Sequence, residues 1–210
     1  MNTQEGVTKF QLVYNRTDPL PYSQLREINA WRKILFQLKL IGRDPNKYGG
    51  VGYGNISQKL TPFDKHRFVI SGTGTGQLAE LDQQHYAVVL DCYPNENKVV
   101  AEGPIQPSSE SLTHGMLYGL DPTVRFIMHV HSPAIWHHAN KLCLPVTDAN
   151  VAYGTRQMAN EVGRLIAQAS TEQGIILTMG GHEDGVIAAG CTAEQAGALL
   201  LRYLARAYQL

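Results

Sequence analysis

Two histidines, His129 and His131, lie two residues apart in the apolar run RFIMHVH, which is typical of a buried β-strand. Residues two apart in a strand point to the same face, with Cα atoms about 6.5–7 Å apart, so both imidazoles can converge on one ion. Val130 then faces the opposite side of the strand, into the core. Because zinc prefers tetrahedral coordination, two further ligands are needed.

Two residues far from this pair in the sequence are candidates for the remaining positions. His182 lies in the glycine-rich turn MGGH between two expected strands, where a loop can project it into a site. Glu110 lies in the first turn of a helix expected over 108–120 and capped by serine, and its carboxylate gains from the helix dipole there. It could act as a ligand or as a general acid/base group. The alternative for the histidine pair is a purely structural role in a partly buried strand.

The other histidines fit a metal site less well. His114 lies four residues after Glu110 on the same helix face and could replace one ligand, although a buried hydrogen bond is the simpler role. His137 and His138 are expected in a helix, where consecutive side chains diverge by about 100°. At most one of these two could therefore reach the ion.

The elements that must position these residues follow from the periodicity of the apolar residues. A short helix is expected after Pro133, and helical spacing is found in four longer stretches: 22–41, 108–120, 155–169 and 193–208. Strand-like runs are VGYGNISQKL, RFVIS, RFIMHVH, GIILTM and GVIAAG. The runs HYAVVLDCY and KVVAEG, joined by a turn at 94–97, predict a hairpin. Strands in the middle with helices before and after indicate an α/β sandwich with a mixed or antiparallel sheet.

Composition and charge narrow the class of protein. The 210 residues are 43% hydrophobic and 17% charged, which suits a single domain, placed at 20–210 after a loose N-terminal arm over 1–19. Eighteen basic residues balance eighteen acidic ones, so a small molecule is the expected partner rather than nucleic acid or a membrane. Three widely spaced cysteines, no signal-like first residues and no apolar run of about 20 residues predict a cytoplasmic protein.

Five segments occur in the order found in the class II aldolase/adducin family, which the sequence resembles. They are GNIS at 54–57, ISGTG at 70–74, PSSES at 107–111, HVH at 129–131 and GGHEDG at 180–185. The separation from Glu110 to His129, 129 − 110 = 19 residues, is similar to the family's spacing between its active-site glutamate and its histidine pair. The resemblance implies a three-layer α/β/α sandwich with a central mixed, largely antiparallel sheet. It also implies a homotetramer whose active sites lie between neighbouring subunits.

A set of site residues is implied by the same resemblance. One divalent metal ion per chain, Zn²⁺ by expectation, would be bound by His129, His131 and His182. Glu110 would be a ligand in the resting site and the acid/base group once substrate displaces it. The substrate phosphate would be held by Gly54, Asn55, Thr73, Gly74, Ser108 and Ser109. Backbone N–H groups, hydroxyls and a helix N-terminus can hold a dianion without a basic cluster, although ISGTGTG by itself would be an ordinary glycine turn.

Three features depart from the family pattern. Family members commonly have glycine directly after the third histidine, whereas here Glu183 and Asp184 follow it. This acidic pair could contact substrate, but a solvated turn is the simpler expectation. The loop ISGTGTGQL is glycine-richer than usual, which would alter the grip on phosphate. The aldolases take a proton-donating tyrosine from a neighbouring subunit. Tyr153 is the candidate here, with Tyr203 and Tyr208 as alternatives whose simpler role is packing.

The resemblance implies a function as well. We expect a metal-dependent, aldolase-like lyase that cleaves a small phosphorylated ketose or sugar acid through a metal-stabilised enediolate, with Glu110 moving the proton. Epimerisation, dehydration and decarboxylation use related chemistry in the family and are alternatives. A non-catalytic, adducin-like interaction module is another, although the retained histidines and glutamate argue against it. A hydrolase that activates water on the metal is a third.

Overall fold

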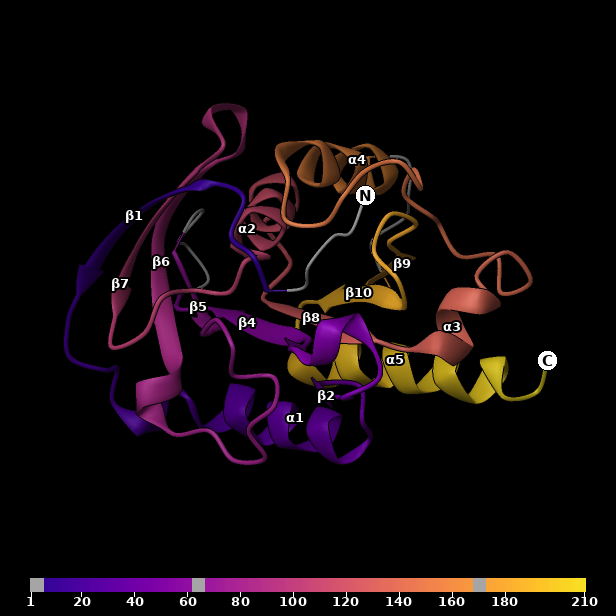
Figure 1. Ribbon diagram of the computed structural model, residues 1–210, viewed down its shortest axis with the longest axis horizontal. Helices are drawn as coiled ribbons and strands as arrows, with labels where there is room; N and C mark the ends of the chain where they lie inside the picture. Colours follow the sequence, from indigo (N-terminus) through magenta and orange to yellow (C-terminus); the bar gives the residue numbers. More distant parts are fainter. Residues whose placement is uncertain (1–5, 62–66, 168–172) are drawn as a thin grey trace.

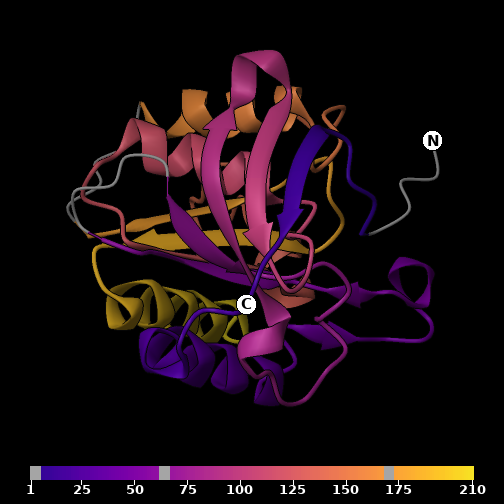
Figure 2. The ribbon, with the colours of Figure 1, turned by 90° about the vertical axis from the view of Figure 1, so that its left-hand side faces the viewer.

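A computed structural model describes residues 6–61, 67–167 and 173–210. Its central sheet has helices on both faces (Figure 1). One face carries α2 (Ser111–Leu120) and α4 (Arg156–Ile166), and the other carries α1 (Arg26–Gln37) and α5 (Ala193–Ala207). The short helix α3 (Pro133–His137) packs beside α5. Figure 2, turned by 90°, shows the three layers in section, with the sheet between the two pairs of helices.

Eight strands of the described chain form the main sheet, in the order β1-β7-β6-β5-β4-β8-β10-β9. In sequence order they are β1 (Gln11–Arg16), β4 (Asn55–Lys59), β5 (Phe68–Ser71), β6 (Tyr86–Tyr93), β7 (Lys98–Gly103), β8 (Phe126–His131), β9 (Ile175–Thr178) and β10 (Gly185–Gly190). β1 pairs in parallel with β7, and the other neighbours pair antiparallel. A separate two-stranded sheet joins β2 (Gly42–Arg43) to β3 (Gly52–Tyr53). The predicted α/β/α sandwich with a mixed, largely antiparallel sheet is confirmed.

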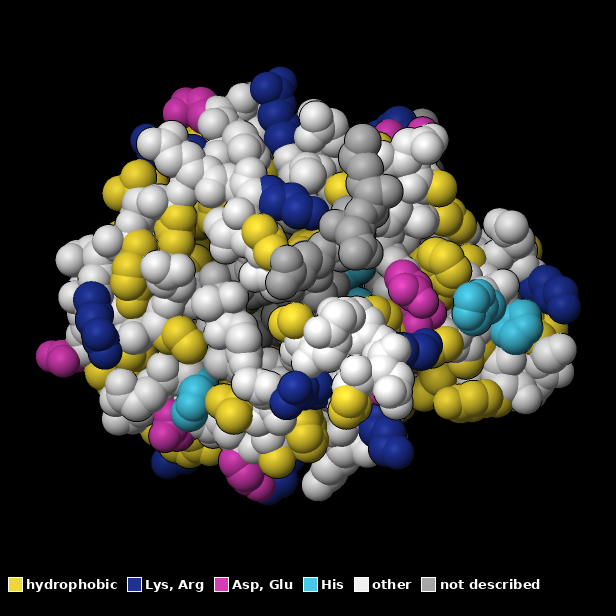
Figure 3. Space-filling view, in the orientation of Figure 1, with side chains coloured by type: hydrophobic (Ala, Val, Ile, Leu, Met, Phe, Trp, Pro, Cys, Tyr) yellow, Lys and Arg dark blue, Asp and Glu magenta, His cyan; other side chains and the backbone are white. Residues whose placement is uncertain are grey.

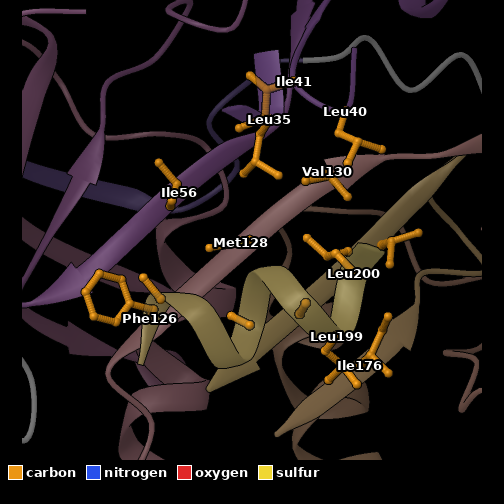
Figure 4. Close-up of a cluster of buried hydrophobic side chains, with 14 of the residues drawn as sticks. Leu35, Leu40, Ile41, Ile56, Phe126, Met128, Val130, Ile176, Leu199 and Leu200 are labelled. Atoms are coloured by element: carbon orange, nitrogen blue, oxygen red, sulfur yellow. The ribbon is translucent and has the colours of Figure 1, made fainter. Parts of the chain in front are cut away.

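Alternation along β8 divides its side chains between the two cores. Met128 and Val130 pack with α1 and α5, in the cluster that Figure 4 shows around Leu200. Ile127 packs in the opposite cluster, on the side of α2 and α4. His129 therefore shares the face of Ile127, while Val130 points into the core, as the sequence predicts.

Most helices and strands lie where the periodicity places them. β6 and β7 form the predicted hairpin, and β9 and β10 form the predicted strand pair. The helix expected over 22–41 is shorter, because a 3₁₀ turn at Tyr22–Gln24 precedes α1 and the helix ends at Gln37. The helix expected over 155–169 is described to Ile166 as α4, and its last expected residues lie outside the described part of the chain.

The N-terminal stretch differs from expectation. Residues 11–16 of the predicted loose arm form the edge strand β1, paired along its whole length with β7. Four of its six side chains are exposed, and its sequence QLVYNR shows no regular alternation of apolar and polar residues. An edge strand depends on backbone hydrogen bonds to its neighbour, which a search for apolar periodicity does not detect.

Charged side chains of both signs are dispersed over the face seen in Figure 3, in keeping with the balanced composition. Among the described residues, no helix is both long enough and apolar enough to cross a membrane.

Candidate metal and substrate site

Three histidines from two parts of the chain meet on the α2/α4 side of the sheet. His129 and His131 project from the central strand β8, and His182 comes from the turn between β9 and β10. One ring nitrogen from each lies within 4.8 Å of the other two, and all three side chains are buried. We call these residues the three-histidine group. Three imidazole nitrogens at this separation can bind a single ion.

The turn that carries His182 is closed by its own backbone. The His182 N–H donates to the Met179 carbonyl at 3.1 Å, and the Met179 N–H donates to the Gly185 carbonyl at 2.8 Å. Gly181 lies so close to a neighbouring loop that an added Cβ would be 1.9 Å from the carbonyl oxygen of Val151. Glycine is therefore required at this position for the turn to bring His182 to the group.

Burial sets the charge state of the strand histidines. It lowers the pKa of His129 and of His131 well below the usual value, and the neighbouring His182 lowers both further. The two imidazoles are therefore neutral at pH 7, the form in which histidine binds a metal. Neither ring nitrogen of His131 has a hydrogen-bond partner among the described residues. Buried nitrogens with free lone pairs fit a divalent cation as their partner.

Glu110 lies beside this group. Its carboxylate is buried, with Oε1 at 3.9 Å from Nδ1 of His182. Glu110 is not close enough to all three histidines to join the three-histidine group itself. The predicted serine cap is wrong: α2 begins at Ser111 with Glu110 as its N-cap residue, because Ser108 instead accepts from the Glu110 N–H at 3.3 Å in the preceding turn.

A small cavity of about 20 Å³ lies among the loops before β4, after β5 and before α2. All six residues predicted to hold phosphate line it: Gly54, Asn55, Thr73, Gly74, Ser108 and Ser109. We call this cavity the cradle. Asn55 is the register partner of His129 across β4 and β8, which places the cradle beside the three-histidine group. Gly54 and Gly74 have φ of +77° and +72°, values that glycine adopts without strain.

A buried arginine that the sequence reading missed supports the loop of the cradle. Arg32 of α1 is 1% exposed, and its guanidinium donates to the carbonyls of Thr75 at 2.9 Å and Gly76 at 3.1 Å. A signal was present, because position 32 lies on the same helix face as the buried Ile28 and Leu35. A charged residue on an apolar face needs buried acceptors, which the carbonyls of the glycine-rich loop supply.

The candidate tyrosine lies in the site of its own chain. Tyr153 is 1% exposed, and its ring stacks on His182 with centroids 4.5 Å apart. Its hydroxyl accepts from the Val7 N–H at 3.2 Å. Of the alternatives, Tyr203 packs against the core at α5, and Tyr208 is 77% exposed at the end of α5.

Two other described histidines, His114 and His137, lie outside the three-histidine group. His114 is buried, with Nδ1 at 2.7 Å from Oγ of Ser57, so the expected buried hydrogen bond is confirmed. Burial lowers the pKa of His114 to about 3. His137 ends α3, with Nε2 at 4.0 Å from Oδ1 of Asp184.

The expectation of a solvated acidic turn is wrong for Asp184 and holds for the exposed Glu183. Asp184 is 1% exposed and has a left-handed backbone, with φ of +62°. Its Oδ2 accepts from Nζ of Lys47 at 2.9 Å and from the hydroxyl of Tyr48 at 2.5 Å. These two donors lie 137 and 136 residues earlier in the chain, and their hydrogen bonds offset part of the cost of burying the carboxylate.

Comparison with known proteins identifies the class of protein to which this fold and site belong. Residues 46–209 match the family model described as the class II aldolase and adducin N-terminal domain. The chain is therefore a member of the class II aldolase/adducin family, as its motifs indicate.

Three solved structures illustrate the proteins that share this fold. L-fuculose-1-phosphate aldolase from Thermus thermophilus is 20% identical with a TM-score of 0.62, covering 90% of this chain and 92% of that one. YgbL from Klebsiella pneumoniae, for which aldolase, epimerase and decarboxylase are alternatives, is 19% identical with a TM-score of 0.65, covering 91% and 90%. A sugar-phosphate aldolase from Thermotoga maritima is 17% identical with a TM-score of 0.56, covering 89% and 94%. At these identities the similarity establishes the fold.

Proposed function

We propose that the chain is a metal-dependent, aldolase-like lyase acting on a small phosphorylated ketose or related sugar acid. The observation that carries the proposal is the three-histidine group, whose ring nitrogens lie within 4.8 Å of one another. Glu110 and the cradle lie directly beside it. Family membership supports the same class of chemistry.

The three-histidine group would hold one divalent cation, with zinc as the expected ion because three neutral imidazoles are typical zinc ligands. Glu110, 3.9 Å from His182, is placed to complete the set when no substrate is bound. A bound cation would supply Lewis-acid chemistry, polarising the substrate carbonyl and stabilising the negative charge of an enediolate.

The residues of the chain would perform the remaining tasks. The cradle would hold the phosphate through exposed backbone N–H groups and hydroxyls. In the cleavage direction, the hydroxyl of the departing aldehyde loses its proton and the carbon–carbon electron pair moves toward the carbonyl. Glu110 would deliver a proton to the carbon left behind, or remove it in the reverse direction. Tyr153, stacked on His182, is the candidate for the proton transfer at the hydroxyl.

Epimerase, dehydratase and decarboxylase reactions stay as alternatives, because each can start from the same polarised carbonyl. The similarity in fold to YgbL, for which three reactions are considered, agrees with this breadth. A non-catalytic interaction module is less well supported, because it would not need neutral, buried imidazoles aimed at one point. A metal-dependent hydrolase would differ from the aldolase class in not exchanging a carbon-bound proton of its substrate.

We further propose a single domain over 20–210, a cytoplasmic location and a homotetramer with active sites between subunits. The continuous main sheet, in which β9 pairs through β10 with β8, supports a single domain. Family membership supports the proposed tetramer, and the composition of the sequence supports the proposed location.

The test is a panel of phosphorylated and unphosphorylated ketoses and sugar acids, assayed with added zinc, cobalt or manganese. Glu110→Gln should keep the metal and lose turnover at least about 100-fold, because general acid–base catalysis contributes about 10²–10⁴-fold. Glu102→Gln, at a half-buried glutamate of β7, is the matched control and should keep both properties. Near-normal turnover of Glu110→Gln on the true substrate would contradict the proposed role.

A further inference from the structure

Two tyrosine rings enclose the imidazole of His131. The Tyr48 ring meets it edge to face, with centroids 4.4 Å apart and an interplanar angle of 77°. The Tyr53 ring stacks on it at 5.0 Å and 30°. The Tyr53 hydroxyl is itself fixed by donating to the Lys39 carbonyl at 3.2 Å.

A hydrogen bond does not hold this ring. Metal-binding histidines ordinarily donate their second ring N–H to a carboxylate or carbonyl, which fixes the orientation of the imidazole. Neither ring nitrogen of His131 has such a partner in the described part of the chain. The orientation of His131 therefore depends on packing, and so on whatever fixes the Tyr48 ring.

Asp184 fixes Tyr48. The Tyr48 hydroxyl donates to Oδ2 of the buried Asp184 at 2.5 Å, and Nζ of Lys47 donates to the same oxygen at 2.9 Å. Tyr48 and Asp184 both have left-handed backbones, with φ of +53° and +62°. Such values are uncommon outside glycine and persist where surrounding contacts hold them. The backbone of Asp184 is also tied to β8, because its carbonyl accepts from the Ser132 N–H at 2.8 Å.

We propose that Asp184 is a positioning residue for the metal site. Through its hydrogen bond to Tyr48, it holds the tyrosine ring against His131 and so fixes the imidazole in the orientation that binds the ion. This inference rests on the proposed metal-dependent function. It also assigns a role to one of the two residues, Glu183 and Asp184, by which the turn departs from the family pattern.

The test is the affinity of the metal-free chain for zinc, measured by competition with a chromophoric chelator. Asp184→Gly removes the carboxylate at a position whose φ glycine adopts without strain, and should weaken zinc binding about 10- to 100-fold. Asp184→Asn keeps an acceptor for the Tyr48 hydroxyl, so its zinc affinity should lie much closer to that of the parent chain than to that of Asp184→Gly. Tyr48→Phe keeps every charge but removes the hydroxyl, and should weaken binding in the same direction as Asp184→Gly.

Three comparisons separate a positioning role of Asp184 from an effect of its charge alone. The double variant Tyr48→Phe/Asp184→Gly should bind zinc no more weakly than Asp184→Gly alone, because both changes break the same hydrogen bond. Glu183→Gln, at the exposed neighbour, should stay within about two-fold of the parent chain. The visible spectrum of the cobalt-loaded Asp184→Gly chain should differ from that of the parent, reporting a changed ligand geometry.

Three results would overturn the inference. Equal zinc affinity of Asp184→Gly and the parent would show that the carboxylate does not act on the site. Equal losses in Asp184→Asn and Asp184→Gly would show that charge, and not the hydrogen bond to Tyr48, is responsible. Additive losses in the double variant would show that the two residues act independently. Failure of the parent chain itself to bind zinc would instead overturn the proposed function, and this inference with it.

Discussion

Replacing Gly181 by alanine should displace His182 from the three-histidine group. The new Cβ would lie 1.9 Å from the carbonyl oxygen of Val151. Carbon and carbonyl oxygen approach favourably to about 3.3 Å, so one of the two loops must move by about 1.4 Å (3.3 − 1.9). Metal–ligand distances tolerate deviations of only about 0.2 Å. A displacement of this size should therefore remove His182 as a ligand.

The expected result is a zinc affinity at least about 100-fold weaker, since even residues that only orient ligands cost about 10–100-fold when mutated. Chelator competition measures it, with urea unfolding of the metal-free chain as a check of folding. Gly119→Ala is the matched control. It lies on the exposed side of α2, with nothing within 4 Å of an added Cβ.

The control should keep its zinc affinity and gain about 0.5–1 kcal/mol in the free energy of unfolding, because alanine is a better helix former than glycine. Unchanged zinc affinity in Gly181→Ala, with the fold intact, would refute the reasoning. Either His182 would not be a ligand, or the loop carrying Val151 would yield without moving the turn.

Two further predictions concern buried polar groups. Burial lowers the pKa of His114 to about 3, against about 6.5 when unfolded, so only the unfolded chain takes up this proton between those values. The stability that comes from keeping His114 neutral is therefore fully present above pH 6.5 and is lost as the pH falls below that value. Between pH 7 and pH 5, the free energy of unfolding in urea should fall by about 2 kcal/mol (1.5 × 1.36) more in the parent chain than in His114→Gln. Equal falls in the two chains would contradict this prediction. Arg32→Met should lower the free energy of unfolding by about 3 kcal/mol by leaving loop carbonyls unpaired, whereas Lys33→Met, at an exposed surface pair, should change it little.

The layers of the fold were predictable because their signals are local. The spacing of Ile28 and Leu35 marks one face of α1, and both are buried. Alternation along β8 correctly sends Val130 into one core and His129 to the other face. At the hairpin, the turn PNEN ends in Asn97, whose φ of +52° suits asparagine. Each of these signals acts over a few residues, which is why they could be read before the structure was known.

The features that were missed depend on contacts between distant parts of the chain. Asp184 is buried because Lys47 and Tyr48, more than 130 residues earlier, donate to it. Local composition favoured a solvated acidic turn. Arg32 is buried because the loop after β5 offers it carbonyl oxygens.

The site was predicted in part from geometry and in part from the family. The His-x-His pair follows from strand periodicity alone. His182 was a candidate from its glycine-rich turn, whereas the cradle residues came from the resemblance. Nothing local indicates that the loops after β3, β5 and β7 meet beside β8. The structure brings all of these residues together, while their roles in binding and catalysis stay predictions.

The most direct test of the account is an anomalous diffraction map, recorded at the zinc absorption edge from crystals grown with zinc. The account predicts one peak per chain, about 2.0–2.1 Å from a ring nitrogen of each of His129, His131 and His182. A peak elsewhere, or no peak in crystals grown with saturating zinc, would contradict the account.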